Sequence, residues 1–352
     1  EFQDISSYSS KQAYKKNQKK KKRTGLKVFL SFICVILVLV GGVMIYASTV
    51  LLGDLKTTTI TKDKTELGIS EETKSEAGIT NIALFGVDAR DYDGGTFAGR
   101  SDAIMVMSID NVHHKVKLTS IMRDVRVYMG DGSPYDSGYD KLNHAYMYGG
   151  PEQAIRTINQ NFGLDIQDYV TVNFASMAKI VDAFGGVNID LTEEEVEQIN
   201  INMRDLAATS PDSMAGDVST YAPLSAGEGV LLNGDEAVAY GRIRAIGNDN
   251  GRVERQQEVL SALLSKASSI SKLEYPSIIQ QLAPLCETSL TFDKMIGLAQ
   301  IALTGFDIER LSIPSDVEGY ASDYCEGGGW MWTYDTDVAA QHIHEFIYED
   351  EN

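Results

Sequence analysis

From Thr80 to the end of the chain, apolar and polar positions alternate between two spacings, one typical of strands and one typical of helices. NIALFGVD (81–88) and DAIMVMSID (102–110) are short apolar runs that end in Asp, a pattern typical of strands buried on both faces. KVKLTSIM (115–122) alternates and predicts a strand beside them. Three further segments have the same short apolar character and are predicted strands: 169–174, 187–191 and 308–313.

Longer amphipathic stretches separate these strands and predict helices. The clearest is GGPEQAIRTINQNFG (149–163), which has Pro151 at a first helical turn and closes on Gly163. The other predicted helices are 176–185, 234–242, 251–269, 275–285, 292–304 and 335–348. Because strands and helices alternate, we expect one α/β domain over residues 80–352, with a central mixed sheet flanked by helices.

The first 52 residues have the pattern of a membrane anchor. Residues 1–27 carry a basic block, and Val28 to Leu52 then runs 25 residues without a charge. At about 1.5 Å per residue, this run can cross a hydrocarbon core of about 30 Å as a helix. It is longer than the apolar region of a signal peptide, about 7–15 residues, and lacks a small-residue cleavage site. The positive-inside rule places residues 1–27 in the cytoplasm and the α/β domain outside the cell, after a polar linker over residues 53–79.

The charge of the chain is strongly acidic, with a formal net value of −19. Residues 53–352 alone hold 22 basic and 48 acidic groups, which gives −26. A nucleic-acid-binding domain is expected to be basic, so the charge argues against nucleic acid as a partner. Against this background, four arginines fall within Tyr240–Gln256 (YGRIRAIGNDNGRVERQ). Since a guanidinium presents a planar fork of donors to phosphate or carboxylate oxygens, the segment predicts an anion site.

Spacing within this segment predicts that its cations converge. Arg242 and Arg244 are two residues apart and share a face if the chain is extended there. Arg252, Arg255 and Gln256 follow at helical spacing near a predicted helix N-terminus, which itself favours anions. Up to four guanidiniums, an amide and a helix end can therefore meet one polyanion. The alternative is surface pairing with the many carboxylates, which contributes under about 1 kcal/mol per pair.

Carboxylates and further arginines flank the first two predicted strands of the domain. Asp88 and Arg90 lie where the first strand ends, and Arg100 and Asp102 lie where the second begins. If these strands are antiparallel neighbours, both carboxylates reach one edge of the sheet. Two carboxylates beside bound phosphates are the usual protein share of a Mg²⁺ site, although Asp in a turn or cap is the simpler alternative. Arg123 stands at the end of the third strand.

Three other features have a structural interpretation beside a functional one. His144 lies in KLNHAYMYGG, where a single histidine is more often structural than catalytic. Trp330 and Trp332, in GGGWMWTY, can stack on sugars, but core packing is the favoured interpretation. Cys286 and Cys325 fall in a compartment that permits a disulfide, and two free thiols are equally consistent with the sequence.

In these segments the chain resembles the LytR-CpsA-Psr (LCP) family of Gram-positive envelope proteins. The resemblance spans about residues 80–260, in the family's order and behind a single N-terminal span. The fold it implies is a single LCP-type α/β domain. It rests on NIALFGVDAR, GRSDAIMVMSID, SIMRDVRV, KLNHAYMYGG, DYVTVNFASMAKIVDAFGGVNIDL and LNGDEAVAYGRIRAIGNDNGRVERQQ.

The resemblance implies a Mg²⁺-dependent phosphotransferase of the cell membrane. Such an enzyme moves a glycopolymer, for example teichoic acid or capsule polysaccharide, from an undecaprenyl-pyrophosphate carrier to a peptidoglycan acceptor. Asp88 and Asp102 are then expected to hold the metal, and Asp249 to accept the proton of the acceptor hydroxyl, with Asp88 as the alternative base. The implied pyrophosphate-binding residues are Arg90, Arg100, Arg123, Arg242, Arg244, Arg252 and Gln256, of which Arg242 and Arg244 also assist the transfer. One departure from the family is that the stretch between Arg244 and Asp249 is a couple of residues shorter.

Two other functions use the same residues. A non-catalytic membrane protein could hold a lipid-linked polyanion or regulate the envelope, and a lipid-pyrophosphate hydrolase would use water as the acceptor. The carboxylates at positions 88, 102 and 249 weaken anion binding unless a metal or a proton transfer requires them. This favours the transferase.

Overall fold

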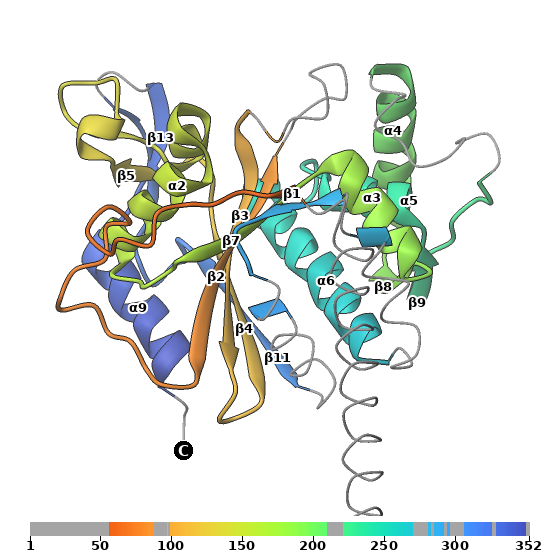
Figure 1. The fold of residues 1–352 in the computed structure, drawn as a ribbon. Coiled ribbons are helices and arrows are strands. Elements are labelled where there is room, and N and C mark those ends of the chain that lie inside the picture. The colour runs from red at the N-terminus through yellow and green to blue at the C-terminus, as the bar shows by residue number, and fades with distance from the viewer. Residues whose placement is uncertain are drawn as a thin grey trace, which may run out of the picture. The chain divides into compact units, whose positions relative to one another are not determined.

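A seven-stranded mixed sheet forms the centre of the domain in the computed structural model of the chain (Figure 1). The structure describes residues 56–87, 97, 99–209, 221–269, 281–282, 285–291, 294–295, 306–325 and 329–349. In spatial order the strands are β1 (Lys56–Thr57), β10 (Glu287–Thr288), β7 (Asp168–Asn173), β2 (Ile79–Val87), β3 (Ser101–Asp110), β4 (Lys115–Ile121) and β11 (Asp307–Ile313). The strands β2, β3 and β4 are consecutive in the chain, whereas β7 and β11 join them from distant segments.

The three central strands confirm the predicted neighbours. β2 pairs antiparallel with β3, and β3 pairs antiparallel with β4. On the outer sides, β7 runs parallel to β2, and β11 runs parallel to β4. Because β2 and β3 are antiparallel, the end of β2 and the start of β3 meet at one edge of the sheet, where the carboxylates at positions 88 and 102 were expected.

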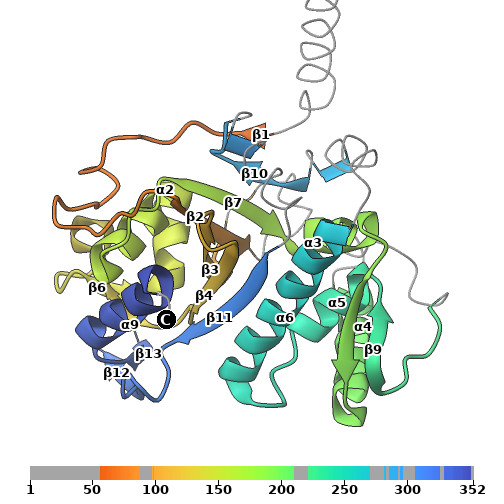
Figure 2. The ribbon, with the colours of Figure 1, turned by 90° about the horizontal axis from the view of Figure 1, so that it is seen from below.

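Helices cover both faces of this sheet (Figure 2). One face packs against α2 (Leu142–Phe162) and α9 (Thr336–Tyr348), and the other packs against α6 (Asn248–Ser269). Beside α6 lie α3 (Phe174–Ala183), α4 (Glu193–Thr209) and α5 (Gly234–Gly241), which share a second core with it. The single α/β domain with a mixed sheet between helices is therefore confirmed.

Strand β2 shows how the sequence produces this layering. Successive side chains of a strand point to opposite faces, so a strand between two helical layers needs apolar residues at both sets of positions. Ala83 and Phe85 are buried towards α2 and α9, whereas Ile82 and Leu84 pack on the side of α6. The continuous apolar run of this segment follows from burial on both faces.

The structure adds elements that the sequence did not predict. The helix predicted at 149–163 begins at Leu142, because a first helical piece precedes the non-helical Gly149 and Gly150; Pro151 then starts the second piece, and Gly163 ends it in the left-handed conformation. Helix α4 and the short 3-10 helix η2 (Gly130–Gly132) were not predicted either. Three two-stranded sheets complete the domain: β5 (Arg126–Tyr128) with β6 (Tyr139–Lys141), β8 (Val187–Leu191) with β9 (Gly227–Leu232), and β12 (Ala321–Cys325) with β13 (Gly329–Thr333).

The predicted linker over residues 53–79 is part of the domain from Lys56 onward. Strand β1 pairs with β10, and Leu67 is fully buried in the core under α2. Asn159 Nδ2 of α2 donates a hydrogen bond to the Leu67 carbonyl at 2.9 Å. Ile60 and Ile69 are buried in the same core. The polar composition of this segment concealed three aliphatic anchors, which is why it was taken for a linker.

Several predicted segments lie outside the described residues. They are the cytoplasmic tail and membrane span (1–52) and most of the helices predicted at 275–285 and 292–304. Within the described ranges, no helix is both long and apolar enough to cross a membrane. Cys286 is a free thiol that donates to the Leu282 carbonyl at 3.3 Å, and burial raises its pKa to about 11.

Candidate functional site

Asp102 occupies a β-bulge at the edge where β2 ends. Gly86 pairs with Ala103 and Val87 pairs with Ser101, so Asp102 is the extra residue on β3. A bulge leaves one residue unpaired in the ladder and redirects its side chain. At Gly86 a Cβ would lie 3.0 Å from the Ala103 Cβ, so glycine allows the two strands to approach closely here. The bulge thus frees the Asp102 carboxylate for contacts beyond the sheet.

The partner of Asp102 is Arg123, two residues after the end of β4. Arg123 Nη1 donates to Asp102 Oδ1 at 2.5 Å, and its Nε donates to Asp124 Oδ2 at 2.9 Å. Lys141 Nζ completes the network at 3.1 Å from Asp124 Oδ1. Burial opposes both charges, but their attraction outweighs it: the pKa of Arg123 is raised and the pKa of Asp124 is lowered from the ordinary values. Both groups are therefore charged at neutral pH.

The oxygen atoms around this network fit the ligand chemistry of Mg²⁺. Asp102 uses one carboxylate oxygen for Arg123, and the other makes no hydrogen bond within the part of the chain that the structure describes. The buried Asn143 Oδ1 also has no partner there, although the Asn143 backbone N–H donates to the Arg123 carbonyl at 2.9 Å. Carboxylate and amide oxygens suit a hard cation that retains waters and binds phosphate. The other expected metal ligand, Asp88, lies outside the described residues, as does Arg90.

Helix α5 delivers the first half of the arginine segment. A capping box between Asn233 and Glu236 starts the helix, and Arg242 is its C-cap. The Arg242 guanidinium lies over the Phe174 ring, 4.7 Å from its centroid. Ile243 is fully buried between half-buried Arg242 and exposed Arg244, so the core holds the backbone here. The backbone at Arg242 is helical rather than extended, and the common face predicted for Arg242 and Arg244 stays a prediction.

Two glycines turn the chain from Arg244 into α6. Gly247 has a φ of 72°, and a Cβ on Gly251 would lie 2.6 Å from the Ile246 carbonyl oxygen. Asp249 lies in the first turn of α6, and its side chain is not among those that the structure describes.

The predicted helical stripe of α6 divides into two parts. Gln256 Nε2 donates to the Gly241 carbonyl at 3.3 Å and so joins α6 to the end of α5. Arg252 is buried, with 3% of its surface exposed. Arg255 instead pairs with Glu195 of α4 at 3.0 Å and donates to the Ile246 carbonyl. The expectation that four guanidiniums converge is therefore corrected at Arg255, which ties α6 to α4.

An apolar cavity of about 230 Å³ opens between the sheet and helices α3, α5 and α6. Its lining includes Ala103, which follows Asp102 in the chain, and Gly241, which precedes Arg242. Phe174, over whose ring the Arg242 guanidinium lies, also lines it. Its remaining lining is Leu84, Phe85, Gly86, Met105, Val170, Val172, Asn173, Met177, Ile180, Ala237, Val238, Gln256, Val259, Leu260 and Leu263.

This cavity could not be predicted from the sequence. Its lining residues have the same composition and spacing as a packed core, so only the packing distinguishes a cavity from a filled interior.

His144 is held by a buried carboxylate that the sequence analysis missed. His144 Nδ1 lies 3.0 Å from both oxygens of Asp140, and the Tyr148 hydroxyl donates to Asp140 Oδ2 at 2.7 Å. Burial raises the pKa of Asp140, but the hydrogen bonds from His144 and Tyr148 outweigh it and lower the pKa. Burial and the Asp140 carboxylate raise the pKa of Tyr148, and the positive charge of the exposed Arg100 acts to lower it. This places Tyr148 within electrostatic reach of Arg100, one of the predicted pyrophosphate-binding residues. The spacing of Asp140 and His144, four residues apart, was the available signal.

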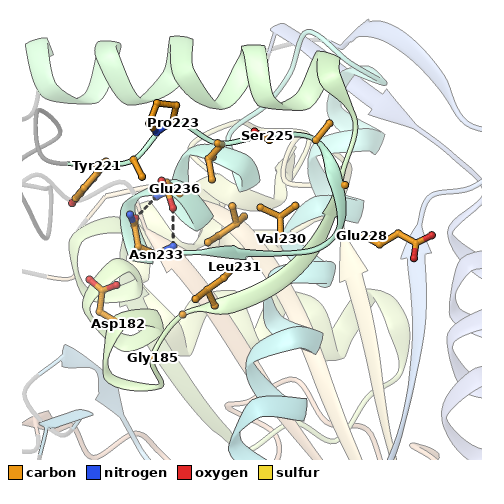
Figure 3. A pocket seen from close by; sticks show the side chains of 16 residues that line it. Asp182, Gly185, Tyr221, Pro223, Ser225, Glu228, Val230, Leu231, Asn233 and Glu236 are labelled. Carbon is orange, nitrogen blue, oxygen red and sulfur yellow. Dashed lines mark hydrogen bonds between the residues drawn. The ribbon is translucent and has the colours of Figure 1, made fainter.

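A larger hollow of about 790 Å³ lies at the other end of α5, between α4 and β9 (Figure 3). Asp182, Glu228 and Glu236 contribute carboxylates to it, and its described lining contains no Lys or Arg. None of the predicted site residues lines it. An acidic hollow repels a pyrophosphate, so size does not identify the anion site.

Comparison with known proteins places the chain among envelope proteins. The model of the LytR_cpsA_psr family matches residues 43–346. The TagT polyisoprenyl-teichoic acid–peptidoglycan teichoic acid transferase of Bacillus subtilis is 26% identical over 313 residues, covering 85% of this chain and 91% of TagT. A transferase of the same description, TagU of Halalkalibacterium halodurans, is 30% identical over 241 residues, covering 67% of this chain and 69% of TagU.

Solved structures share the fold. TagT bound to LI-WTA superposes with a TM-score of 0.61 at 21% identity, covering 82% of this chain and 99% of that structure. A second structure, the LytR-CPS2A-psr family protein YwtF (TagT) with bound octaprenyl pyrophosphate lipid, gives a TM-score of 0.56 at 20% identity, with the same coverage. These similarities extend over nearly the whole of the other chains.

Proposed function

Because this chain belongs to the LytR-CpsA-Psr family, we propose that it transfers a glycopolymer from a polyprenyl-pyrophosphate carrier to peptidoglycan. One observation carries the proposal: the Arg242 guanidinium lies over Phe174, which lines an apolar cavity, so a lipid and a pyrophosphate can be bound together. The relatives are named teichoic acid transferases, and a structure of the same fold holds an octaprenyl pyrophosphate. An undecaprenyl chain is the carrier we propose for this protein.

The proposed binding mode follows the polarity of the cavity. The apolar tail lies among the side chains of α3, α5 and α6. The pyrophosphate lies near Gln256, a polar residue of the lining, and near Arg242. Exposed Arg244 and Arg100 lie outside the buried core and can close on the phosphate oxygens. Arg123, fixed between Asp102 and Asp124, presents a charge that needs no rearrangement when the substrate arrives.

In the proposed reaction, a sugar hydroxyl of peptidoglycan attacks the phosphorus on the polymer side of the pyrophosphate. The bond to the bridging oxygen breaks, and polyprenyl phosphate leaves. Phosphoryl transfer depends mainly on positioning and on stabilisation of charge, which the arginines supply to the leaving phosphate. Asp249, in the first turn of α6, is the proposed acceptor of the hydroxyl proton, and Asp88 is the alternative. A Mg²⁺ ion held by Asp102 and Asp88 would add charge neutralisation on the phosphate oxygens.

We also propose that residues 28–52 anchor the domain to the outer face of the cell membrane. A lipid-linked donor stays at that surface, so an anchored enzyme meets its substrate in two dimensions. The polymer transferred is proposed to be a phosphate-linked glycopolymer of the teichoic acid class, by analogy with the named relatives.

The test uses the full chain in detergent with Mg²⁺, a lipid-pyrophosphate-linked saccharide and peptidoglycan. We expect saccharide–peptidoglycan product, and we expect Arg244→Ala to lower its rate by about 10²–10³-fold, the usual effect of removing one charge-stabilising donor. Arg310→Ala is the matched control, because Arg310 lies on β11 outside the site and is about as accessible, with 43% of its side chain exposed. Binding of the donor without formation of product or release of phosphate would refute the proposal that the chain is an enzyme. Release of saccharide phosphate without a peptidoglycan product would identify a hydrolase.

A further inference from the structure

Four aromatic residues form a continuous surface on and beside the β12–β13 hairpin. Tyr324 and Trp330 are directly paired across the two strands, and Trp332 lies two residues further along the same side of β13. The Trp330 and Trp332 ring centroids are 5.1 Å apart at 71°, and Tyr320 meets Trp332 at 5.2 Å and 74°. The Tyr320, Trp332 and Trp330 rings therefore form one edge-to-face row, and Tyr324 lies opposite Trp330 across the hairpin.

The opposite face of the hairpin attaches it to the domain. Met331 is fully buried, and the Trp332 backbone N–H donates to the Asp124 carbonyl at 3.0 Å. Tyr324 is 80% exposed, and Trp330 and Trp332 are half-buried. Core packing, the favoured interpretation of Trp330 and Trp332, holds in part for Trp332, which packs against the buried core. It does not extend to Trp330, which is outside the core clusters of the described residues. Contiguous exposed aromatic surface of this kind marks interaction sites more often than single exposed residues do.

This aromatic surface touches the candidate site at two points. Lys141 Nζ lies 5.2 Å from the Trp330 ring centroid, and the same ammonium pairs with Asp124, which holds Arg123. At the other end, Asn250 Nδ2 donates to the Tyr320 hydroxyl at 3.1 Å, and Asn250 follows Asp249 in α6. The row of rings therefore runs from the arginine network to the residue next to the proposed base.

The surface also lies across the sheet from the lipid cavity. Figure 1 shows β13 on the side of β5 and α2, whereas α3, α5 and α6 lie on the other side of the central strands. In an in-line phosphoryl transfer, the attacking oxygen approaches opposite the leaving oxygen. If the leaving lipid phosphate lies beside the cavity, an acceptor bound on the side of the hairpin approaches from the opposite side of the sheet.

We propose that Tyr320, Tyr324, Trp330 and Trp332 bind the peptidoglycan glycan strand by stacking on its pyranose rings, and so position the acceptor hydroxyl. This inference rests on the proposed function, because that function supplies the acceptor. The flat apolar faces of pyranose rings match aromatic rings, and the neutral amide of Asn250 and the ammonium of Lys141 provide donors at the edges of the row. The saccharide of the donor is the alternative occupant, and the experiment separates the two.

The two tryptophans of the chain are both in β13, so intrinsic tryptophan fluorescence reports on this surface alone. We expect soluble peptidoglycan oligosaccharides to change the emission of the full chain in a saturable way. Farnesyl pyrophosphate, which occupies the lipid and phosphate sites only, should leave the emission unchanged. Trp330→Ala should abolish the response to the oligosaccharides.

Steady-state kinetics provide the second measurement. Trp330→Ala and Tyr324→Ala should each raise the KM for peptidoglycan about 10-fold, while kcat and the KM for the lipid-linked donor stay within about twofold. Trp330→Phe should retain most of the acceptor affinity, since it keeps a ring. Val317→Ala is the matched control, because Val317 is 64% exposed on the same C-terminal segment and lies outside the aromatic row. Tyr324 is exposed enough that its substitution tests the surface even if a tryptophan variant fails to fold.

The outcomes distinguish this inference from the proposed function. Suppose the wild-type chain transfers saccharide. If the variants then change neither the KM for peptidoglycan nor the emission response to the oligosaccharides, the aromatic surface is not an acceptor site. A rise in donor KM with unchanged acceptor KM would assign the surface to the donor saccharide and overturn the proposal. If the wild-type chain has no transferase activity, the proposed function fails, and the oligosaccharide titration alone then decides whether the hairpin binds glycan.

Discussion

The two faces of the central sheet differ in how completely they are filled. Towards α2 and α9, Phe85 of β2 is 1% exposed and meets Tyr146 of α2 with ring centroids 5.1 Å apart. Towards α3, α5 and α6, the adjacent Leu84 borders a cavity of about 230 Å³. Protein interiors normally contain few voids larger than a water molecule. The packed face is therefore built for stability, and the hollow face gives up contacts that a ligand can supply.

The same two regions differ in how they hold buried charge. On the packed side, the carboxylate of Asp124 pairs with Arg123 and Lys141, and its pKa is lowered. On the side of α3, α5 and α6, at the separate acidic hollow, burial raises the pKa of Glu236 at the start of α5, although the Asn233 N–H bond opposes it, and the nearby Asp182 and Asp235 raise it further. One region neutralises its charges and the other gathers like charges. Both contrasts can be tested with matched substitutions.

The largest effect is expected from filling the cavity. Val172→Phe adds a ring to the cavity lining on β7 and should lower lipid-donor binding and transfer by about 100-fold or more, with little loss of stability. Measurement of donor binding and thermal unfolding on the same preparations separates the two effects. Val106→Phe is the matched control: Val106 is fully buried on the packed face, where overpacking costs about 1–3 kcal/mol. Equal destabilisation by the two variants would contradict the conclusion that the face towards α3, α5 and α6 contains an unfilled cavity.

Much of the fold could be predicted because periodicity reports burial directly. Strands β2, β3 and β4 and helix α6 were placed within a few residues, since their apolar positions recur at regular spacing. Residues 56–79 were misjudged because three aliphatic anchors in a polar segment leave no period. The hairpins β5–β6 and β12–β13 were missed because each strand has only three or five residues.

The site was predictable where chemistry and spacing coincide. Arg123, Arg242 and Gln256 lie in segments whose charge pattern stands out from an acidic chain. Arg255 shares that pattern but pairs with Glu195, and no local signal gives the position of a partner 60 residues away. The bulge at Asp102 depends on a register shift between two strands, which a single sequence does not encode visibly.

A second comparison uses isoleucines on the two sides. Ile158 of α2 is fully buried in the packed core, and Ile180 of α3 lines the cavity. We expect Ile158→Ala to cost about 4 kcal/mol and Ile180→Ala about 2 kcal/mol, because the contacts around Ile180 are already incomplete. Urea unfolding gives both values. Ile180→Ala should also alter donor binding, which Ile158→Ala should leave unchanged; the reverse pattern would remove the basis of the comparison.

Neutralising a paired carboxylate tests the charge contrast on the packed side. Asp124→Asn should cost about 2 kcal/mol at pH 7, because Arg123 and Lys141 lose their common partner. The folded pKa of Asp124 lies below its ordinary value of 3.8, so its contribution is present above that pH and is lost as the pH falls through the folded pKa. The variant and the wild type should thus converge in stability only at strongly acidic pH. A difference that persists unchanged there would refute the role of the charge.

The smallest effect is expected at the start of α5, and it has the opposite sign. Glu236 has a raised pKa, so its stabilising protonated state is complete below its ordinary pKa of 4.5 and is lost as the pH rises through the folded pKa. Glu236→Gln imitates the protonated form and keeps an acceptor for the Asn233 N–H. The variant should be more stable than the wild type at pH 7, by on the order of 0.5–1 kcal/mol, and equal to it near pH 4. Urea unfolding at the two pH values measures the difference, and Glu254→Gln, an exposed position of α6, is the control.

Lower stability of Glu236→Gln at pH 7 would mean that attraction of the charge to the helix N-terminus outweighs burial and repulsion. The hollow side would then neutralise its buried charge as the packed side does, and the two regions would differ only in packing.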